Sequence, residues 1–295
     1  MEDFVHLHVH THYSILDGQS KISYLVDKAV KNGMKGMAIT DHGVMFGIKE
    51  FSDYCVRINK GRKERGEKPF KPIFGCEMYV ARRTKFNKDK SQHDNSGYHL
   101  VVLAKNYKGY QNLIRIVSRA WIDGYYYRPR TDREDLEKYH EGLIVCSACI
   151  AGEVPAKILK GDIEGAREAC EWYHRVFGDD YYLELQRHEV KDPQLVANRD
   201  VFPLQQKANE MLMQFAREYS IKLVCTNDCH FEDKETAEAH DHLLCLSTNE
   251  ELNAPNRLRY SKQEWFKTRE EMNEVFADIP EALTNTLDIL NKVEI

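Results

Sequence analysis

Four histidines occupy alternate positions near the start of the chain, in the stretch FVHLHVHTHYSILDG that begins at Phe4. Alternate residues of an extended strand point to the same face, so the four imidazoles would share one face if the strand ran that far. Such a face makes a poor apolar core, whereas neutral imidazole is a common ligand of zinc, manganese and iron. The spacing therefore indicates a metal site; the competing interpretation is a polar edge strand whose histidines bind nothing.

Further residues of metal-binding type stand where predicted apolar strands end. They are His10, His42, Glu77, Cys149, Asp228 and His230. His99 is the exception, because it stands near the start of the segment HLVVL. In barrels built of strands and helices the active site lies at the carboxyl ends of the strands, so residue type and placement agree.

Seven short apolar segments must position these side chains, and they alternate with segments of helical periodicity. The first begins at Phe4, and the others are 37–40, 72–80, 99–103, 142–146, 181–185 and 222–226. Helices are predicted between them, among others over 154–160 and 163–177. This alternation predicts an α/β fold with a parallel sheet, whose apolar strands are buried on both faces as in a barrel.

The composition is that of an ordinary globular chain. Its 295 residues allow one large domain or two, and its net charge of −5 excludes attraction of the whole surface to nucleic acid. The eight cysteines are scattered, and we find neither a secretory signal nor an apolar run of membrane-spanning length. We therefore expect a cytoplasmic protein with reduced thiols and no membrane partner.

The pattern changes after His230. Helices follow, one of them opened by a predicted capping box of Thr268 and Glu271, and the last helix runs straight into the chain end. We predict a metal-binding barrel over residues 1–250 and a helical extension over 251–295, and we expect the chain to belong to a longer protein.

Several motifs together carry a family resemblance. The stretches HLHVHTHYSILDG, AITDHGVMFG, PIFGCEMYVA, YHLVVLAKNYKGYQNL, GYYYRPRTDRE and TNDCHF occur in this order. They resemble the PHP (polymerase and histidinol phosphatase) family of metal-dependent phosphoesterases, and within it the N-terminal PHP domains of bacterial replicative DNA polymerases, the polymerase III alpha subunits. The resemblance covers nearly the whole chain.

The resemblance implies a distorted seven-stranded, TIM-like barrel with up to three divalent metals, zinc or manganese before magnesium or iron. Carried over motif by motif, the implied ligands are His8, His10, Asp17, His42, Glu77, His99, Cys149, Asp228 and His230. We expect the reaction to depend on His10, Glu77, Asp228 and His230. Carboxylates can bridge two metals, so Glu77 is the expected bridge.

Some of these assignments have competitors. Asp17 precedes Gly18 and would also suit a turn, and Cys146 competes with Cys149 as the thiol ligand. His6 is interpreted as a hydrogen-bonded core residue and His12 as a residue that supports the ligands.

Basic residues lie in the segment after the third predicted strand and within the aromatic stretch YYYRPR. Mixed aromatic and basic segments are typical of surfaces that bind single-stranded nucleic acid, although basic loops are often simply solvated. The predicted DNA-binding residues are Arg82, Arg83, Lys85, Arg128 and Arg130.

Two functions remain open. The domain is either a metal-dependent phosphoesterase that acts as a 3′–5′ proofreading exonuclease by metal-activated water, or a non-catalytic module stabilised by metals. With either function, the resemblance implies that the full-length protein is a DNA-synthesising nucleotidyltransferase. The expected partners are the palm and thumb of the same protein, the 3′ end of single-stranded DNA, an exonuclease subunit and other replisome subunits. The polymerase-type motifs disfavour a free-standing histidinol-phosphatase type, and an amidohydrolase barrel would use Lys105, which here belongs to LAKNYKGYQNL.

Overall fold

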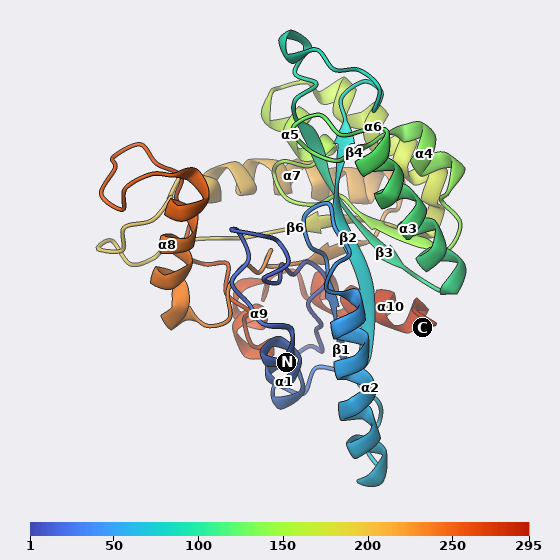
Figure 1. The fold of residues 1–295 in the computed structure, drawn as a ribbon, viewed down its shortest axis with the longest axis vertical. Helices are drawn as coiled ribbons and strands as arrows, with labels where there is room; N and C mark the ends of the chain where they lie inside the picture. Colours follow the sequence, from blue (N-terminus) through green and yellow to red (C-terminus); the bar gives the residue numbers. More distant parts are fainter. Residues whose placement is uncertain (295) are drawn as a thin grey trace.

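A curled sheet of seven strands lies at the centre of the computed structural model, which describes residues 1–294 (Figure 1). The main path of the sheet has the order β1-β2-β3-β5-β6-β7, and the short β4 pairs with β2. The strands are β1 (Gly36–Ile39), β2 (Lys71–Ala81), β3 (Gly97–Ala104), β4 (Arg130–Thr131), β5 (Leu143–Cys146), β6 (Tyr181–Leu185) and β7 (Leu223–Cys225). The result is a mixed α/β half-barrel, which agrees with the predicted fold class.

The sheet is mixed, so the prediction of an all-parallel sheet was wrong. β1 and β2 are parallel, as are β5, β6 and β7, but β3 runs antiparallel to both β2 and β5. The connection from β2 to β3 is an excursion over residues 82–96 that contains only the short η1 (Lys90–Gln92), not a crossover helix. Without a crossover the chain reverses, and the two strands pair antiparallel.

The histidine-bearing segment near the N-terminus closes the curled sheet without forming a regular strand. On one side, the amide of Ala38 in β1 donates to the carbonyl of His6 at 2.8 Å. On the other side, the amide of His10 donates to the carbonyl of Cys229, just after β7, at 2.7 Å. The predicted first strand is therefore extended backbone with an isolated bridge, and it joins the two edges of the sheet.

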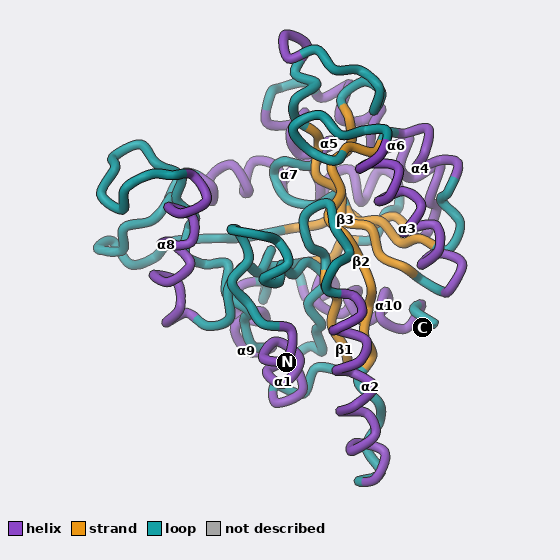
Figure 2. Tube along the Cα trace, viewed as in Figure 1, coloured by secondary structure: helices purple, strands orange, loops and turns teal. Residues whose placement is uncertain are grey.

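Helices surround the strands, as Figures 1 and 2 show. They are α1 (Ile22–Lys31), α2 (Ile48–Glu64), α3 (Tyr107–Ile122), α4 (Arg133–Lys138), α5 (Glu153–Leu159), α6 (Ile163–Phe177), η2 (Gly178–Asp180), α7 (Val201–Tyr219), η3 (Lys234–Thr236), α8 (Ala237–Thr248), α9 (Arg269–Val275) and α10 (Pro280–Lys292). No helix within residues 1–294 has the length and apolarity needed to cross a bilayer.

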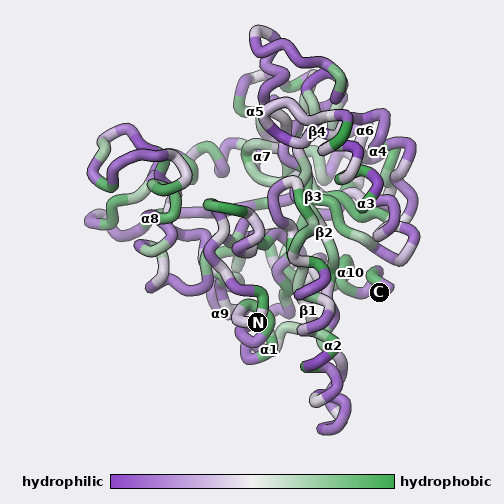
Figure 3. The backbone as a smooth tube through the Cα atoms, viewed as in Figure 1, coloured by the Kyte–Doolittle hydropathy of each residue, from purple (hydrophilic) through white to green (hydrophobic). Residues whose placement is uncertain are grey.

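Local sequence signals explain several of these elements. α6 has the predicted bounds, and Asp162 caps it by accepting a hydrogen bond from the amide of Gly165. The capping box of α9 is present, with Thr268 and Glu271 bonding each other's amides. α2 runs on into the basic residues Lys60, Arg62 and Lys63, and its C-terminal end is hydrophilic (Figure 3).

One hydrophobic core joins the strands to the C-terminal helices. Figure 3 shows the apolar residues gathered along β2 and β3 in the middle of the molecule. Buried side chains of α9 and α10, such as Met272 and Leu290, belong to the same core as those of β5 and β6. The helices after residue 250 therefore share the core of the strands. The predicted domain boundary at residue 250 stays a prediction.

Candidate metal centre

Glu77, buried near the carboxyl end of β2, lies at the centre of the site. Its Oε1 is 2.9 Å from Nδ1 of His99 and 3.3 Å from Nε2 of His8. Its Oε2 is 2.7 Å from Nδ1 of His42 and 3.2 Å from Nε2 of His10. Each oxygen of one carboxylate thus faces a different pair of imidazoles, which is the arrangement expected of a carboxylate that bridges two cations.

Asp228 approaches the same histidines from the segment after β7. Its Oδ1 lies 3.1 Å from Nε2 of His8 and 3.2 Å from Nε2 of His10. Its carbonyl accepts a hydrogen bond from Nδ1 of His230 at 2.7 Å, which turns Nε2 of that ring toward the cluster. Two residues separated by one position therefore present a carboxylate and an imidazole to one site.

Asp17 completes the solvent side of the cluster. Its Oδ2 is 2.7 Å from Nε2 of His42 and 3.2 Å from Nε2 of His230. Tyr260 donates a hydrogen bond to the other carboxylate oxygen at 2.8 Å, and the ring of His240 donates to the Asp17 carbonyl at 2.8 Å. These two contacts fix a carboxylate that sequence alone left open as a turn residue.

The thiol of Cys149 lies at the edge of the cluster, with Sγ 3.6 Å from Nδ1 of His99. Burial, together with the nearby carboxylates of Glu77 and Asp228, raises the pKa of this thiol well above its usual range. Its competitor Cys146 is buried inside β5 instead.

The ligand-type atoms of the cluster indicate whether cations fit at this site. Six buried atoms of the cluster lie close to other polar atoms but make no hydrogen bond of good geometry: Nε2 of His8, Nε2 of His10, Nδ1 of His42, Oε2 of Glu77, Oδ1 of Asp228 and Nε2 of His230. Buried polar atoms without good hydrogen bonds are costly, and these six converge on one another. Three groups have ligand atoms within 4.8 Å of each other: His10, His42 and His230; His8, His10 and Asp228; and His42, Glu77 and His99. The residues present therefore fit a centre of several divalent cations.

The charges of the site point the same way. Burial disfavours the charged ring of His230, yet the carboxylates of Asp17 and Asp228 outweigh burial and raise its pKa to about 9. Burial and the neighbouring rings of His42 and His230 instead lower the pKa of His10. Imidazoles packed among carboxylates must share protons or cations, so cation binding at this site would release protons.

Other residues that hold the ligands were missed by the sequence analysis. Glu184 in β6 accepts a hydrogen bond from Nδ1 of His8 at 2.6 Å and another from the amide of Ala148 at 3.0 Å. Ser14 contacts Nδ1 of His10 at 2.9 Å and donates to Asp41 at 2.8 Å. An acidic residue inside the apolar strand YYLEL was the available signal for Glu184, since a buried carboxylate needs partners.

Left-handed backbone marks the ligand-bearing turns. Asp228 itself has φ +47°, Leu16 before Asp17 has φ +60°, and Ala148 before Cys149 has φ +62°. Residues other than glycine adopt this region at a cost, and such strain concentrates at functional sites.

His6 and His12 lie outside the cluster. Nε2 of His6 donates to the carbonyl of Lys267 at 2.7 Å, and burial lowers the pKa of this ring to about 3. His12 is exposed and contacts the carbonyl of Ser20 at 3.2 Å. His6 therefore matches the interpretation of a core histidine, whereas His12 makes no described contact with a ligand.

Two of the predicted DNA-binding residues are structural instead. The ammonium of Lys85 is fully buried, 3.3 Å from Asp132 and 3.2 Å from Asp135. The guanidinium of Arg130 is also fully buried and donates to the carbonyls of Lys85, Asp94 and Gly124. Both side chains brace the excursion between β2 and β3, because buried cations need such partners.

The remaining cations of this set face solvent to different degrees. Arg83 and Arg128 are exposed, and Arg82 is half-buried against the ring of Tyr98. Arg83 forms an ion pair with Asp94. Arg128 lies over the ring of Tyr79, 5.7 Å from its centroid, and that ring lies beside His42 and His99.

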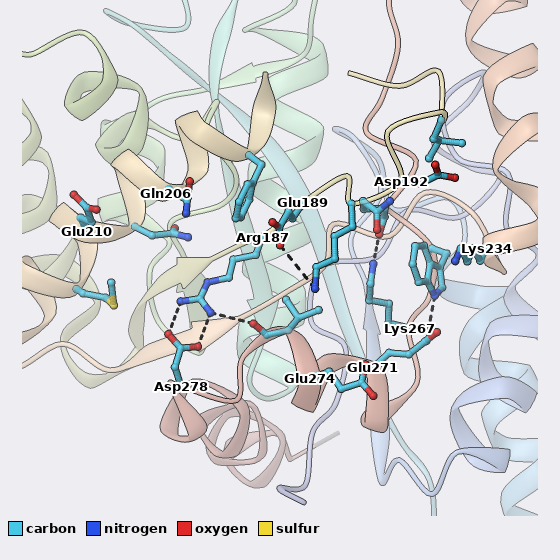
Figure 4. A pocket seen from close by; sticks show the side chains of 18 residues that line it. Arg187, Glu189, Asp192, Gln206, Glu210, Lys234, Lys267, Glu271, Glu274 and Asp278 are labelled. Carbon is cyan, nitrogen blue, oxygen red and sulfur yellow. Dashed lines mark hydrogen bonds and ion pairs between the residues drawn. The ribbon is translucent and has the colours of Figure 1, made fainter. Parts of the chain in front are cut away.

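A separate cavity of about 850 Å³ lies among the segment after β6, α7 and residues 263–278 (Figure 4). Its lining includes none of the predicted metal ligands, and it holds two ion pairs, Arg187 with Asp278 and Lys191 with Glu189. The histidine cluster is thus distinct from this cavity.

Comparison with known proteins shows which family the chain belongs to. The profile of the PHP domain family matches residues 6–188. DNA polymerase III subunit alpha of Borreliella burgdorferi is 43% identical over 292 residues, which cover 99% of this chain and 24% of that protein. The same subunit of Thermus aquaticus is 38% identical over 99% of this chain and 22% of that protein. The chain thus spans about a quarter of the length of these relatives.

Solved structures are more distant. A Bifidobacterium adolescentis protein whose name suggests a metal-dependent phosphoesterase aligns with a TM-score of 0.42 and 13% identity, covering 93% of this chain and 96% of that one. An amidohydrolase from Chromobacterium violaceum aligns with a TM-score of 0.43 and 13% identity, covering 77% of this chain and 87% of that one.

The fold and the cluster define a class of proteins, the α/β half-barrels that gather histidines and carboxylates at strand ends around cation positions. Within that class, this chain belongs to the PHP domain family. The family resemblance predicted from the sequence motifs is therefore confirmed.

Proposed function

We propose that this chain is the N-terminal PHP domain of a DNA polymerase III alpha subunit and that its cluster hydrolyses phosphodiester bonds at the 3′ end of single-stranded DNA. The identity of 43% across 99% of the chain supports the first part. The observation that carries the second is the set of six buried ligand-type atoms that converge without hydrogen bonds of good geometry, drawn from segments far apart in the sequence.

The cluster is open on one side, which sets where a substrate would approach. His8, His10 and Glu77 are buried, whereas the side chains of Asp17 and Asp228 are 22% and 16% exposed. Divalent cations held here would lower the pKa of a water molecule and offset the charge on phosphate oxygens. Glu77, with one oxygen toward each pair of histidines, would hold two such cations at a fixed separation.

The neighbouring cations supply the second requirement, a path for a polyanion. Arg128 stands beside Tyr79, whose ring lies 5.3 Å from His99 and 6.1 Å from His42. Its guanidinium is placed to contact a phosphate next to the cluster. Arg82 and Arg83, on the excursion between β2 and β3, supply further positive charge, although Arg83 is paired with Asp94. We propose that the domain works in the cytoplasm, with the polymerase palm and an exonuclease subunit as its partners.

The test uses a single-stranded oligonucleotide labelled at its 5′ end, incubated with the 295-residue chain and Mn²⁺ or Zn²⁺. We expect a ladder of products shortened stepwise from the 3′ end, abolished by chelation and by Glu77→Gln. Glu250→Gln, at an exposed position, is the matched control and should cut like the parent.

Absence of products from protein with bound metal verified by elemental analysis would contradict the hydrolytic proposal. The metals would then only stabilise the fold. This result would favour the alternative function, a non-catalytic module that braces the polymerase. Cleavage that Glu77→Gln leaves unchanged would point to a contaminating nuclease and would equally contradict the proposal.

A further inference from the structure

An exposed aromatic pair stands beside the metal centre. Trp121, near the end of α3, and Tyr125, in the turn that follows, stack with ring centroids 5.4 Å apart and an interplanar angle of 19°. Their side chains are 42% and 48% exposed, and the adjacent Ile122 is 80% exposed. Stacked rings open to solvent represent apolar surface that soluble proteins usually keep for a partner.

The pair is tied to the loop that carries a predicted metal ligand. The indole N–H of Trp121 donates to the carbonyl of Gly43 at 2.8 Å, and Gly43 directly follows His42. Gly43 has φ +63°, and a Cβ there would lie 2.8 Å from the ring of Pro129. The close fit leaves only glycine at this position, so Trp121 and His42 are held in a fixed relationship.

The space between the pair and the cluster carries positive charge and another ring. Arg128 is exposed and precedes Pro129, which packs against Gly43. Its guanidinium lies over Tyr79, the ring next to His42 and His99. The nearby carboxylate of Asp123 is 3.4 Å from the guanidinium of Arg119, which also pairs with Asp135.

We propose that Trp121 and Tyr125 stack against the bases of a single-stranded polynucleotide whose terminal linkage enters the metal centre. Arg128 then contacts a phosphate between the stacked base and the scissile bond. Base stacking on aromatic side chains tolerates any sequence, which suits an enzyme acting on any strand end. This inference rests on the proposed function, because the cluster supplies the reason for a strand to be here.

Binding is measured separately from cleavage, with a fluorescent oligothymidylate whose phosphorothioate linkages resist hydrolysis, added to the metal-loaded chain. We expect Trp121→Ala to weaken binding about tenfold or more, and Tyr125→Ala to weaken it in the same direction. Tyr107→Ala is the matched control, since Tyr107 is an exposed aromatic at the other end of α3, roughly 20 Å away along the helix. Replacing the thymidylate by a uridylate strand distinguishes DNA from RNA as the preferred strand.

Trp121→Phe separates stacking from the hydrogen bond to Gly43. Phenylalanine keeps a stacking ring but no N–H donor, so we expect it to bind within about threefold of the parent. The parent should also lose tryptophan fluorescence on binding, because the other two tryptophans, Trp172 and Trp265, are buried.

Parent-like binding by Trp121→Ala would overturn the inference, whether or not the chain cleaves DNA. So would a loss in Trp121→Phe as large as that in Trp121→Ala, because the side chain would then act through Gly43. Normal binding by the parent with no cleavage of an ordinary strand would contradict the proposed function and leave the stacking site standing.

Discussion

The carboxylate of Glu184 accepts a hydrogen bond from Nδ1 of His8 at 2.6 Å in the buried interior of the sheet. This bond favours a ring proton on Nδ1, so a cation bound between His8, Glu77 and Asp228 would take the lone pair of Nε2. Amide and hydroxyl donors from Ala148 and Thr226 hold Glu184 in turn. One carboxylate therefore fixes the orientation and favours one tautomer of a predicted ligand.

Glu184→Gln should lower the affinity for divalent cations about tenfold or more, because the amide keeps an acceptor but loses the charge that makes His8 a stronger ligand. Isothermal titration with Zn²⁺ or Mn²⁺ measures the change. Glu250→Gln, exposed and remote in the fold, is the control. Equal affinities in the parent and in Glu184→Gln would contradict the claim that Glu184 strengthens His8 as a ligand.

Removal of bound metal should lower the melting temperature. The six buried ligand-type atoms of the cluster would lose their ligand, and a ligand present at 1,000 times its dissociation constant stabilises by about 4 kcal/mol. Thermal unfolding with and without a chelator, followed by re-addition of metal, measures the effect. An unchanged melting temperature after verified removal argues against occupied sites.

Lys85→Met should destabilise the fold by about 3 kcal/mol or more, because it leaves Asp132 and Asp135 buried without this counter-charge. Urea unfolding gives the free energy. Lys88→Met, at an exposed position of the same excursion, is the control and should change it little. A stable Lys85→Met protein with weakened DNA binding would restore the original prediction of a DNA contact.

The stability of Lys267→Met relative to the parent should depend on pH. Burial lowers the pKa of the Lys267 ammonium from 10.5 to about 8, so below pH 8 the folded state carries a buried charge at a cost. That cost fades as pH rises from 8 toward 10.5, because only the unfolded state then remains protonated. The advantage of the methionine variant should therefore be greatest near pH 7 and shrink by up to about 3 kcal/mol at pH 10.5. A difference that stays constant over this range would contradict burial of the charge.

His99 shows that apolar patterns predict the position of a strand but not its direction. Its place near the start of β3 looked inconsistent with a site at the carboxyl ends of strands. The structure pairs His99 with Tyr79 in antiparallel register, so the start of β3 lies beside the carboxyl end of β2. Apolar runs located six of the seven predicted strands, but they do not encode strand direction, which here follows from the connection over residues 82–96.

Other features depend on contacts that no local pattern encodes. The left-handed backbone at Ala148 and Asp228 is imposed by the surrounding packing, since neither residue type favours it strongly enough to be predicted. The burial of Lys85 depends on Asp132, 47 positions away, so its charge alone suggested a solvent-facing role. By contrast, the histidines and carboxylates that the family resemblance implies as ligands do converge in the structure.

The most direct test of the central claim is a count of divalent cations per chain by elemental analysis after exhaustive desalting. We expect more than one Zn²⁺ or Mn²⁺ per chain in the parent, and at least one fewer in Glu77→Gln, which loses the proposed bridging carboxylate. A parent that retains no cation after incubation with these metals, or a Glu77→Gln variant with the same count, would contradict this claim.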